Sequence, residues 1–334
     1  MTSDFEPLFR NPHLATIAGN FWPRSIDETR FPQARKLYRV DDKNAVVSIE
    51  HQPGSLPARG QIVFLHGLEG SASAGYIQSF AQHSLERGFG VHRLNMRTCG
   101  GTEDLCETFY HSGLTGDPLH VLEQIVGRFG APIYLIGFSL GGNVALKLAG
   151  ELGQTSLLAG VCAVSTPIDL AVCVRALDRP SNCLYARRFL TRLKDRVRRK
   201  AATSPGFYST GALEDVRSIW DFDDRFTASL FGFGTAANYY ATQSAARFLH
   251  LIRIPTLVIC SKDDPIVPFQ VYDHPAFQTN PALSLVATKH GGHLGFLSKR
   301  KPRFWIDGVA LTWIEHLAGD SSGRGTKVEH LTSA

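Results

Sequence analysis

The sequence predicts an α/β fold built on a mostly parallel, doubly wound sheet. Short apolar runs, each typical of a buried parallel strand, alternate with segments of helical period through most of the 334 residues. Such alternation favours parallel strands joined by crossover helices. Residues 168–245 break this rhythm, because they carry charge clusters and the aromatic stretches WDFDDRF and FGFGTAANYY where strands would be expected. We therefore expect a sheet core over 34–167 and 246–318, with 168–245 inserted as a cap.

The elements are expected in the following order. Residues 1–33 are rich in proline and aromatic side chains and are predicted to form an irregular N-terminal arm packed on the body. Period-two alternation and apolar runs predict strands at 34–40, 45–51, 61–67, 90–96, 132–139, 160–166, 255–261 and 283–288. Amphipathic spacing predicts helices at 76–87, at 117–128, from Gly141 onward, and at 303–318. The small polar residues 319–334 are predicted to be a disordered tail.

Composition limits the classes of function. Hydrophobic residues make up 43% of the chain, enough for a large core, and the net charge of +5 is too modest to indicate a nucleic-acid partner. The six cysteines are scattered without metal-binding spacing, which predicts reduced thiols. Asp4 and Glu6 stand where a signal peptide would be apolar, and no run of about 18 apolar residues occurs. We expect a cytoplasmic protein without a transmembrane segment, and nothing in the sequence implies a metal or an organic cofactor.

The stretch YLIGFSLGGN, residues 134–143, has the G-x-S-x-G pattern at the junction of a strand and a helix. A serine on such a tight corner has a strained backbone, which costs roughly 1–3 kcal/mol. Gly137 and Gly141 would leave room where a Cβ would clash. The corner would lift the Ser139 hydroxyl above the sheet at the positive end of the following helix. Ser139 is therefore predicted to be a nucleophile.

A serine nucleophile needs a base and an acid, which in this kind of fold follow it in the chain. The loop KHGGHLGF after the last strand offers two histidines, and His293 is favoured over His290 because Gly291 and Gly292 give its loop freedom to reach the serine. CSKDDPIVP, after the penultimate strand, offers Asp263 and Asp264. The spacing to Val-Pro favours Asp264 as the acid that orients the imidazole, and Asp263 is the competitor that would stabilise the turn.

An oxyanion formed during acyl transfer requires two N–H donors aimed at the developing charge. One should be the amide of Leu140, directly after the nucleophile. The other should come from HGLEGS, after the strand at 61–67, where Leu68 follows His-Gly. His66 lies at the end of that strand and precedes the serine in the chain, so it is predicted to shape the loop and not to act as the base.

These blocks together resemble a known family. LHGLEGSASAGYIQSF, NMRTCGGT, YHSGLTGD, GFSLGGNVALK, WDFDDRFTA, DDPIVP, GGHLGF and the early FRNPHLATI resemble the YheT-like branch of the α/β-hydrolase superfamily, to which mammalian ABHD-type lipases are related. The resemblance implies an eight-stranded sheet with an inserted cap and a triad of Ser139, Asp264 and His293. It also implies carboxylic esters, including acylglycerols or other lipids, as the substrate class. One departure is Thr98, where the family more often has glycine.

Two basic features remain open at this point. Arg97, in NMRTCGGT, could hold its loop by a charge-assisted hydrogen bond or bind an acidic substrate group, and the structural role is favoured. The segment ARRFLTRLKDRVRRK, residues 186–200, predicts an amphipathic basic helix. It would either pack its apolar face on the body or contact an anionic membrane. The sequence predicts a serine carboxylic ester hydrolase, and the alternatives are an acyltransferase using the same residues or a non-catalytic binding protein.

Overall fold

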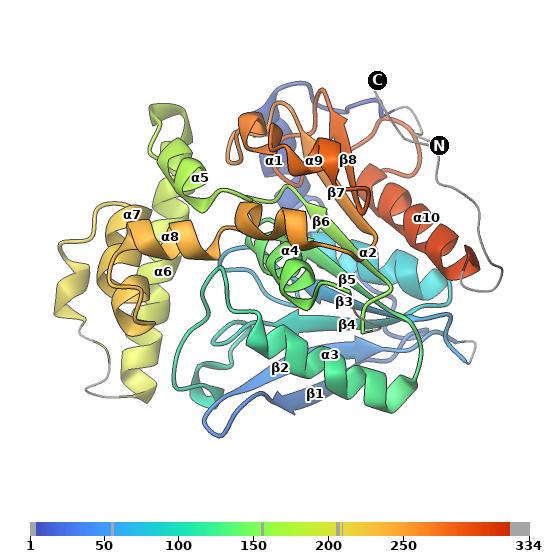
Figure 1. Cartoon of the computed structure of the whole chain (residues 1–334), viewed down its shortest axis with the longest axis horizontal. Coiled ribbons are helices and arrows are strands. Elements are labelled where there is room, and N and C mark those ends of the chain that lie inside the picture. Colours follow the sequence, from blue (N-terminus) through green and yellow to red (C-terminus); the bar gives the residue numbers. More distant parts are fainter. Residues whose placement is uncertain (1–4, 55–56, 155–156, 205–207, 209, 321–334) are drawn as a thin grey trace.

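The computed structural model describes residues 5–54, 57–154, 157–204, 208 and 210–320 (Figure 1). At its centre lies one eight-stranded sheet in the order β1-β2-β4-β3-β5-β6-β7-β8. Its strands are β1 (Ala34–Arg39), β2 (Ala45–His51), β3 (Gln61–Leu65), β4 (Gly90–Asn95), β5 (Ile133–Phe138), β6 (Gly160–Val164), β7 (Thr256–Ser261) and β8 (Leu283–Thr288). The predicted fold class is confirmed, and each expected strand is present within a residue or two of its predicted bounds.

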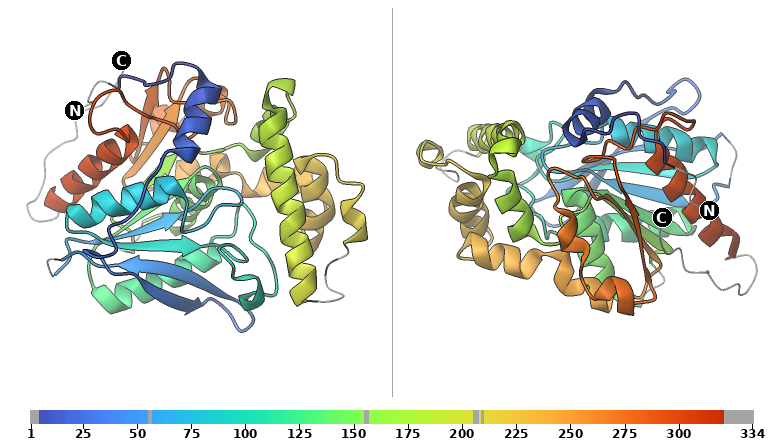
Figure 2. Two further views of the ribbon diagram at one scale, coloured as in Figure 1. Left: turned by 180° about the vertical axis from the view of Figure 1, so that it is seen from behind. Right: turned by 90° about the horizontal axis from the view of Figure 1, so that it is seen from above.

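Strand β2 runs antiparallel to both β1 and β4, and the pairs from β4 to β8 are parallel. Residues of β3, β5 and β6 are buried throughout because helices cover both faces of the sheet. Helices α2 (Gly75–Glu86) and α10 (Trp305–Asp320) pack on one face, and α3 (Gly116–Phe129) and α4 (Leu140–Leu152) pack on the other (Figure 2). This layering leaves the ends of the strands free to carry loops.

The N-terminal arm is not wholly irregular, which corrects the expectation for residues 1–33. Helix α1 (Pro12–Phe21) lies within it. The Asn11 side chain accepts hydrogen bonds from the amides of His13 and Leu14, each at 3.0 Å, and Pro12 occupies the first turn. Asparagine as the N-cap followed by proline in the first turn favours a helix start. This local preference determines the structure of residues 12–21, although the proline and aromatic content of the arm suggested an irregular segment.

The segment between β6 and β7 forms α5 (Leu170–Leu177), α6 (Cys183–Thr203), α7 (Ile219–Phe222) and α8 (Ala236–Gln243), which lie to one side of the sheet (Figure 1). We call α5–α8 the insertion. Leu193 and Val197 of α6 are 2% and 0% exposed, so the apolar side of the predicted amphipathic helix packs inward. The short α9 (Ala276–Thr279) precedes β8.

Three further expectations concern the C-terminal tail, membrane-spanning helices and the cysteines. Of the predicted tail over 319–334, residues 319 and 320 belong to α10, and the rest lies outside the described residues. Within the described ranges, no helix is both long enough and apolar enough to cross a bilayer. All six cysteines are free thiols, and five of them are buried, as expected for small core residues.

Candidate active site

Ser139 occupies a sharp corner between β5 and α4. Its φ of 51° lies in the left-handed region, which is costly for a residue with a side chain. The corner is held by a 2.8 Å hydrogen bond from the Ser139 amide to the Val164 carbonyl on β6. A Cβ on Gly137 would lie 2.3 Å from the Gly141 carbonyl oxygen, and one on Gly141 would lie 2.4 Å from the Leu65 carbonyl oxygen. Gly137 is therefore required by the corner itself, and Gly141 by the approach of the β3 end.

The three predicted side chains meet at this corner. His293 Nε2 lies 3.0 Å from Ser139 Oγ, and His293 Nδ1 lies 2.8 Å from Asp264 Oδ2. Because the carboxylate only accepts, Nδ1 carries the proton and Nε2 is left to accept the hydrogen bond of the serine hydroxyl. His293 and Asp264 are each 8% exposed, whereas Ser139 is half-buried at the cavity wall. The geometry can transfer a proton from the serine to the imidazole and back.

The two aspartates have separate partners. The second carboxylate oxygen of Asp264, Oδ1, accepts the amides of Ile266 at 2.8 Å and Val267 at 2.9 Å, which fixes the carboxylate plane. Asp263 instead lies 3.0 Å from His290 Nδ1. It also accepts the Gly292 amide at 2.9 Å. A second His–Asp pair, whose aspartate directly precedes Asp264 in the chain, thus braces the loop that carries His293.

Helix α1 also holds the His293 loop, which the sequence did not lead us to expect. The His293 amide donates to Thr16 Oγ1 at 2.8 Å, and that hydroxyl donates to the Pro12 carbonyl at 2.7 Å. A Cβ on Gly292 would lie 2.5 Å from the Pro12 carbonyl oxygen, so the loop and the helix touch backbone to backbone. The motif FRNPHLATI was the available signal, but it does not reveal that its threonine contacts a histidine 277 residues later.

The loop after β3 carries the Leu68 amide. The amides on either side of it are taken by tyrosine hydroxyls, since Gly67 donates to Tyr76 at 3.0 Å and Glu69 donates to Tyr110 at 2.8 Å. A Cβ on Gly67 would lie 3.2 Å from Ser139 Cβ, so this loop runs directly beside the serine. The Leu140 amide is the first N–H of α4, and such amides have no acceptor within their own helix. Both amides are therefore candidates to bind an oxyanion.

His66 lies beneath this loop and is fully buried. Its Nδ1 donates to the Gly67 carbonyl at 2.8 Å and its Nε2 accepts the Met96 amide at 3.1 Å. Burial lowers the pKa of His66 to about 4, so the ring is neutral at pH 7. These contacts are those of a residue that shapes the loop, in agreement with the expectation from its position.

A buried ion pair joins the same loop to the insertion. Arg196 Nη1 on α6 lies 2.7 Å from Glu69 Oε1, and the two side chains are 3% and 5% exposed. Burial by itself lowers the pKa of Arg196, but the Glu69 carboxylate, together with Tyr110 and Cys99, outweighs that effect, and the pKa of Arg196 lies above its ordinary value. The guanidinium also lies over the rings of Phe109 and Tyr110, at 4.7 and 4.5 Å. The pair ties the position of the Leu68 amide to the position of α6.

Arg97 has the structural role that was favoured. Its Nε and Nη2 each donate to Asp117 at 2.6 Å, and its Nη1 donates to Thr108 at 2.9 Å. Thr98, the departure from the family pattern, has a φ of 62°. That backbone conformation favours glycine, so Thr98 holds its position at some cost in strain.

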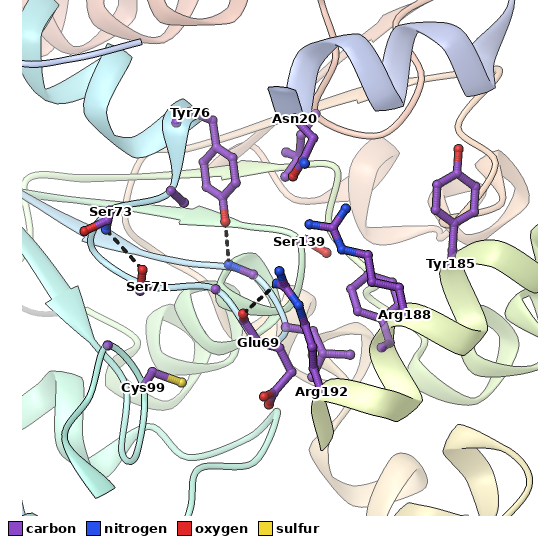
Figure 3. A pocket seen from close by; sticks show the side chains of 18 of the residues that line it. Asn20, Glu69, Ser71, Ser73, Tyr76, Cys99, Ser139, Tyr185, Arg188 and Arg192 are labelled. Carbon is purple, nitrogen blue, oxygen red and sulfur yellow. Dashed lines mark hydrogen bonds between the residues drawn. The ribbon is translucent and has the colours of Figure 1, made fainter. Parts of the chain in front are cut away.

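Two cavities meet at Ser139. The outer cavity, of about 790 Å³, is lined by Ser139, His293 and Leu68 together with residues of α1 and α6 (Figure 3). The inner cavity, of about 80 Å³, lies under the insertion and shares Ser139 and Leu68 with the outer one. Most of its wall is apolar, with Leu140, Pro167, Leu170, Cys173, Val174, Leu177, Phe189, Leu193, Ile219, Ile266 and Val267. The reactive hydroxyl therefore stands between a wide cavity of mixed polarity and a narrow, mostly apolar chamber.

The fold and this site define the class of protein. The chain belongs to the alpha/beta hydrolase fold family, whose model matches residues 60–300. It is 31% identical over 320 residues to "Putative esterase YheT" of Escherichia coli (strain K12), across 94% of this chain and 93% of that protein, which confirms the resemblance to the YheT-like branch. It is also 31% identical to "Phospholipase ABHD3" of Mus musculus, across 73% of this chain and 60% of that protein.

Solved structures share the fold at lower identity. The crystal structure of 2,6-dihydroxy-pseudo-oxynicotine hydrolase superimposes with a TM-score of 0.59 at 18% identity, across 89% of this chain and 70% of that chain. At that identity the likeness supports the architecture alone.

Proposed function

We propose that this protein hydrolyses carboxylic esters, with Ser139 as nucleophile, His293 as general base and acid, and Asp264 as the residue that orients the imidazole. The observation that carries the proposal is the continuous hydrogen-bonded series from Ser139 Oγ through His293, at 3.0 Å, to Asp264, at 2.8 Å. The names of the relatives, an esterase and a phospholipase, support the same class of reaction.

The first half-reaction forms an acyl-enzyme. Ser139 Oγ attacks the ester carbonyl carbon as its proton passes to His293 Nε2, and the carbonyl electrons become an oxyanion. The amides of Leu68 and Leu140 bind that oxyanion at the positive end of α4. The intermediate collapses, the bond to the alcohol oxygen breaks, and His293 gives its proton to that oxygen.

Water completes the cycle. It gives a proton to His293 Nε2 as its oxygen attacks the acyl carbon, and collapse of the second intermediate releases the acid. The proton then returns to Ser139 Oγ. Asp264 keeps the imidazole in the tautomer that accepts from Ser139 and stabilises the imidazolium in both halves.

The two cavities suggest which part of the ester lies where. His293 lines the outer cavity and must protonate the leaving alcohol, so the alcohol part lies there. The acyl part then enters the small apolar chamber under the insertion, which would act as a cap. The size of that chamber favours short acyl chains.

Paired variants test the assignment. We expect Ser139→Ala and His293→Ala to lose at least about a thousandfold of p-nitrophenyl butyrate turnover while remaining folded. Asp264→Asn should also lose most activity, whereas Asp263→Asn and His290→Ala, in the adjacent pair, should lose far less. Equal losses from the two aspartates, or turnover in Ser139→Ala at the wild-type rate, would refute the assignment. Product analysis with added alcohol separates hydrolysis from acyl transfer.

A further inference from the structure

The outer cavity has an uneven balance of charge. Three carboxylates line it, and each has a basic partner of its own. Glu69 pairs with Arg196 at 2.7 Å, Glu103 with Arg199 at 2.6 Å, and Asp195 with Arg198 at 2.7 Å. The negative charges of the wall are thus already neutralised before a substrate enters.

Two other arginines of the wall have no such partner. Arg188 and Arg192 stand one helical turn apart on α6, and both side chains extend into the cavity on the side of Ser139 (Figure 3). Arg188 lies over the Phe21 ring at 5.6 Å, and Arg192 Nη1 donates to the Glu69 carbonyl at 3.3 Å. Among the described residues, neither guanidinium has a carboxylate within salt-bridge distance.

The two guanidinium groups also disfavour one another. Partial burial, followed by the charge of Arg192, lowers the pKa of Arg188 from its ordinary value. Like charges held together at the edge of a cavity are stabilised by an anion placed between them. A guanidinium presents paired N–H donors that match the oxygens of a phosphate or a carboxylate.

We propose that Arg188 and Arg192 form a subsite for an anionic group, a phosphate or a carboxylate, on the alcohol part of the ester. The inference rests on the proposed function, because that function places the alcohol part in the outer cavity beside His293. It adds a substrate class: esters whose alcohol part carries negative charge. Such a group could belong to a free, water-soluble ester or to the head group of a lipid in an aggregate.

A matched pair of substrates tests the subsite. Glycerol 1-butyrate and 1-butyrylglycerol 3-phosphate share the acyl group and the glycerol, and both are monomeric in water. We expect wild type to prefer the phosphate-bearing ester by about tenfold in kcat/KM. In Arg188→Gln/Arg192→Gln that preference should fall to about one. Arg179→Gln/Arg187→Gln removes two exposed charges of the insertion that do not line the cavity, and this variant should keep the preference.

Equal kcat/KM for the two esters in wild type, or a preference lost equally in both double variants, would overturn the subsite. A preference seen only with long-chain esters in vesicles would also overturn the subsite. The negative charge would then act through contact between the protein surface and the vesicle, and not through Arg188 and Arg192 in the cavity. When kcat/KM is measured at increasing ionic strength, the preference of wild type for the phosphate-bearing ester should weaken, as expected for an exposed arginine pair.

Failure of the subsite and failure of the proposed function give different results. Cleavage of glycerol 1-butyrate without a preference for the phosphate ester removes the subsite and leaves the hydrolase. Binding can be measured without turnover by titrating sn-glycerol 3-phosphate into Ser139→Ala and following the phosphorus resonance. Saturable binding that disappears when Arg188 and Arg192 are also replaced would support the subsite even if neither ester is cleaved, and its absence would overturn it.

Discussion

The ion pair between Glu69 and Arg196 yields the most quantitative prediction. Both side chains are nearly inaccessible, at 5% and 3% exposed, and their charged atoms are 2.7 Å apart. Glu69→Gln leaves the guanidinium buried with no carboxylate, and Arg196→Met leaves the carboxylate buried with no cation. Removing one partner of a buried pair costs about 3–5 kcal/mol. For a domain of this size that loss lowers the melting temperature by roughly 4–7 °C.

Urea denaturation of the two single variants and the double variant measures the coupling. We expect the double variant to lose clearly less than the sum of the single variants, because removing both charges leaves neither uncompensated. Glu69 directly follows Leu68, so Glu69→Gln should also lower kcat for p-nitrophenyl butyrate. Lys43→Gln breaks the exposed pair with Glu107, whose side chains are 67% and 41% exposed, and it should leave stability almost unchanged. Additive losses, or single variants as stable as Lys43→Gln, would refute the reasoning.

Three further predictions follow from the packing around the site. Thr16→Val removes the acceptor of the His293 amide and should lower kcat about tenfold, whereas Thr16→Ser should restore it, as steady-state kinetics can show. Burial, with help from the charges of Lys147 and Arg97, lowers the pKa of His111 to about 3, so between pH 6.5 and 5 only the unfolded chain takes up this proton and stability falls as the pH falls. Denaturation at both pH values should show that His111→Gln abolishes about 2 kcal/mol of that loss, and an unchanged slope would contradict the burial argument. Val174→Phe narrows the inner cavity, so kcat/KM should fall for hexanoate esters and hold for acetate esters.

The strands and the serine corner could be predicted because their signals are local. Apolar runs mark strands that are buried on both faces. Gly137 is required by a contact within one turn of the chain, and Gly141 is required by the end of the neighbouring strand β3. The pairing of His293 with Asp264 could be anticipated from the chain order of the loops. The adjacent Asp263–His290 pair, at 3.0 Å, shows how close the alternative lies.

Contacts between distant segments could not be predicted from the sequence in this way. Thr16 sits in an arm that reads as irregular, and its role depends on α1 lying against the His293 loop. The sequence predicts Arg196 to be one of several exposed basic residues on a surface helix, yet the fold buries its side chain against Glu69. Arg188 and Arg192 share that helix and remain in the cavity. The helical periodicity of the sequence does not show which arginines of α6 are buried against the rest of the protein and which remain exposed.

Detection of a covalent intermediate tests the hydrolase assignment most directly. Wild-type protein mixed with p-nitrophenyl butyrate and quenched with acid within milliseconds should carry one butyryl group, and mass spectrometry of its peptides should locate that group on Ser139. His293→Ala should accumulate little of this species. Turnover that proceeds with the butyryl group on another residue, or with none on Ser139 in any quench, would contradict acyl transfer through this serine.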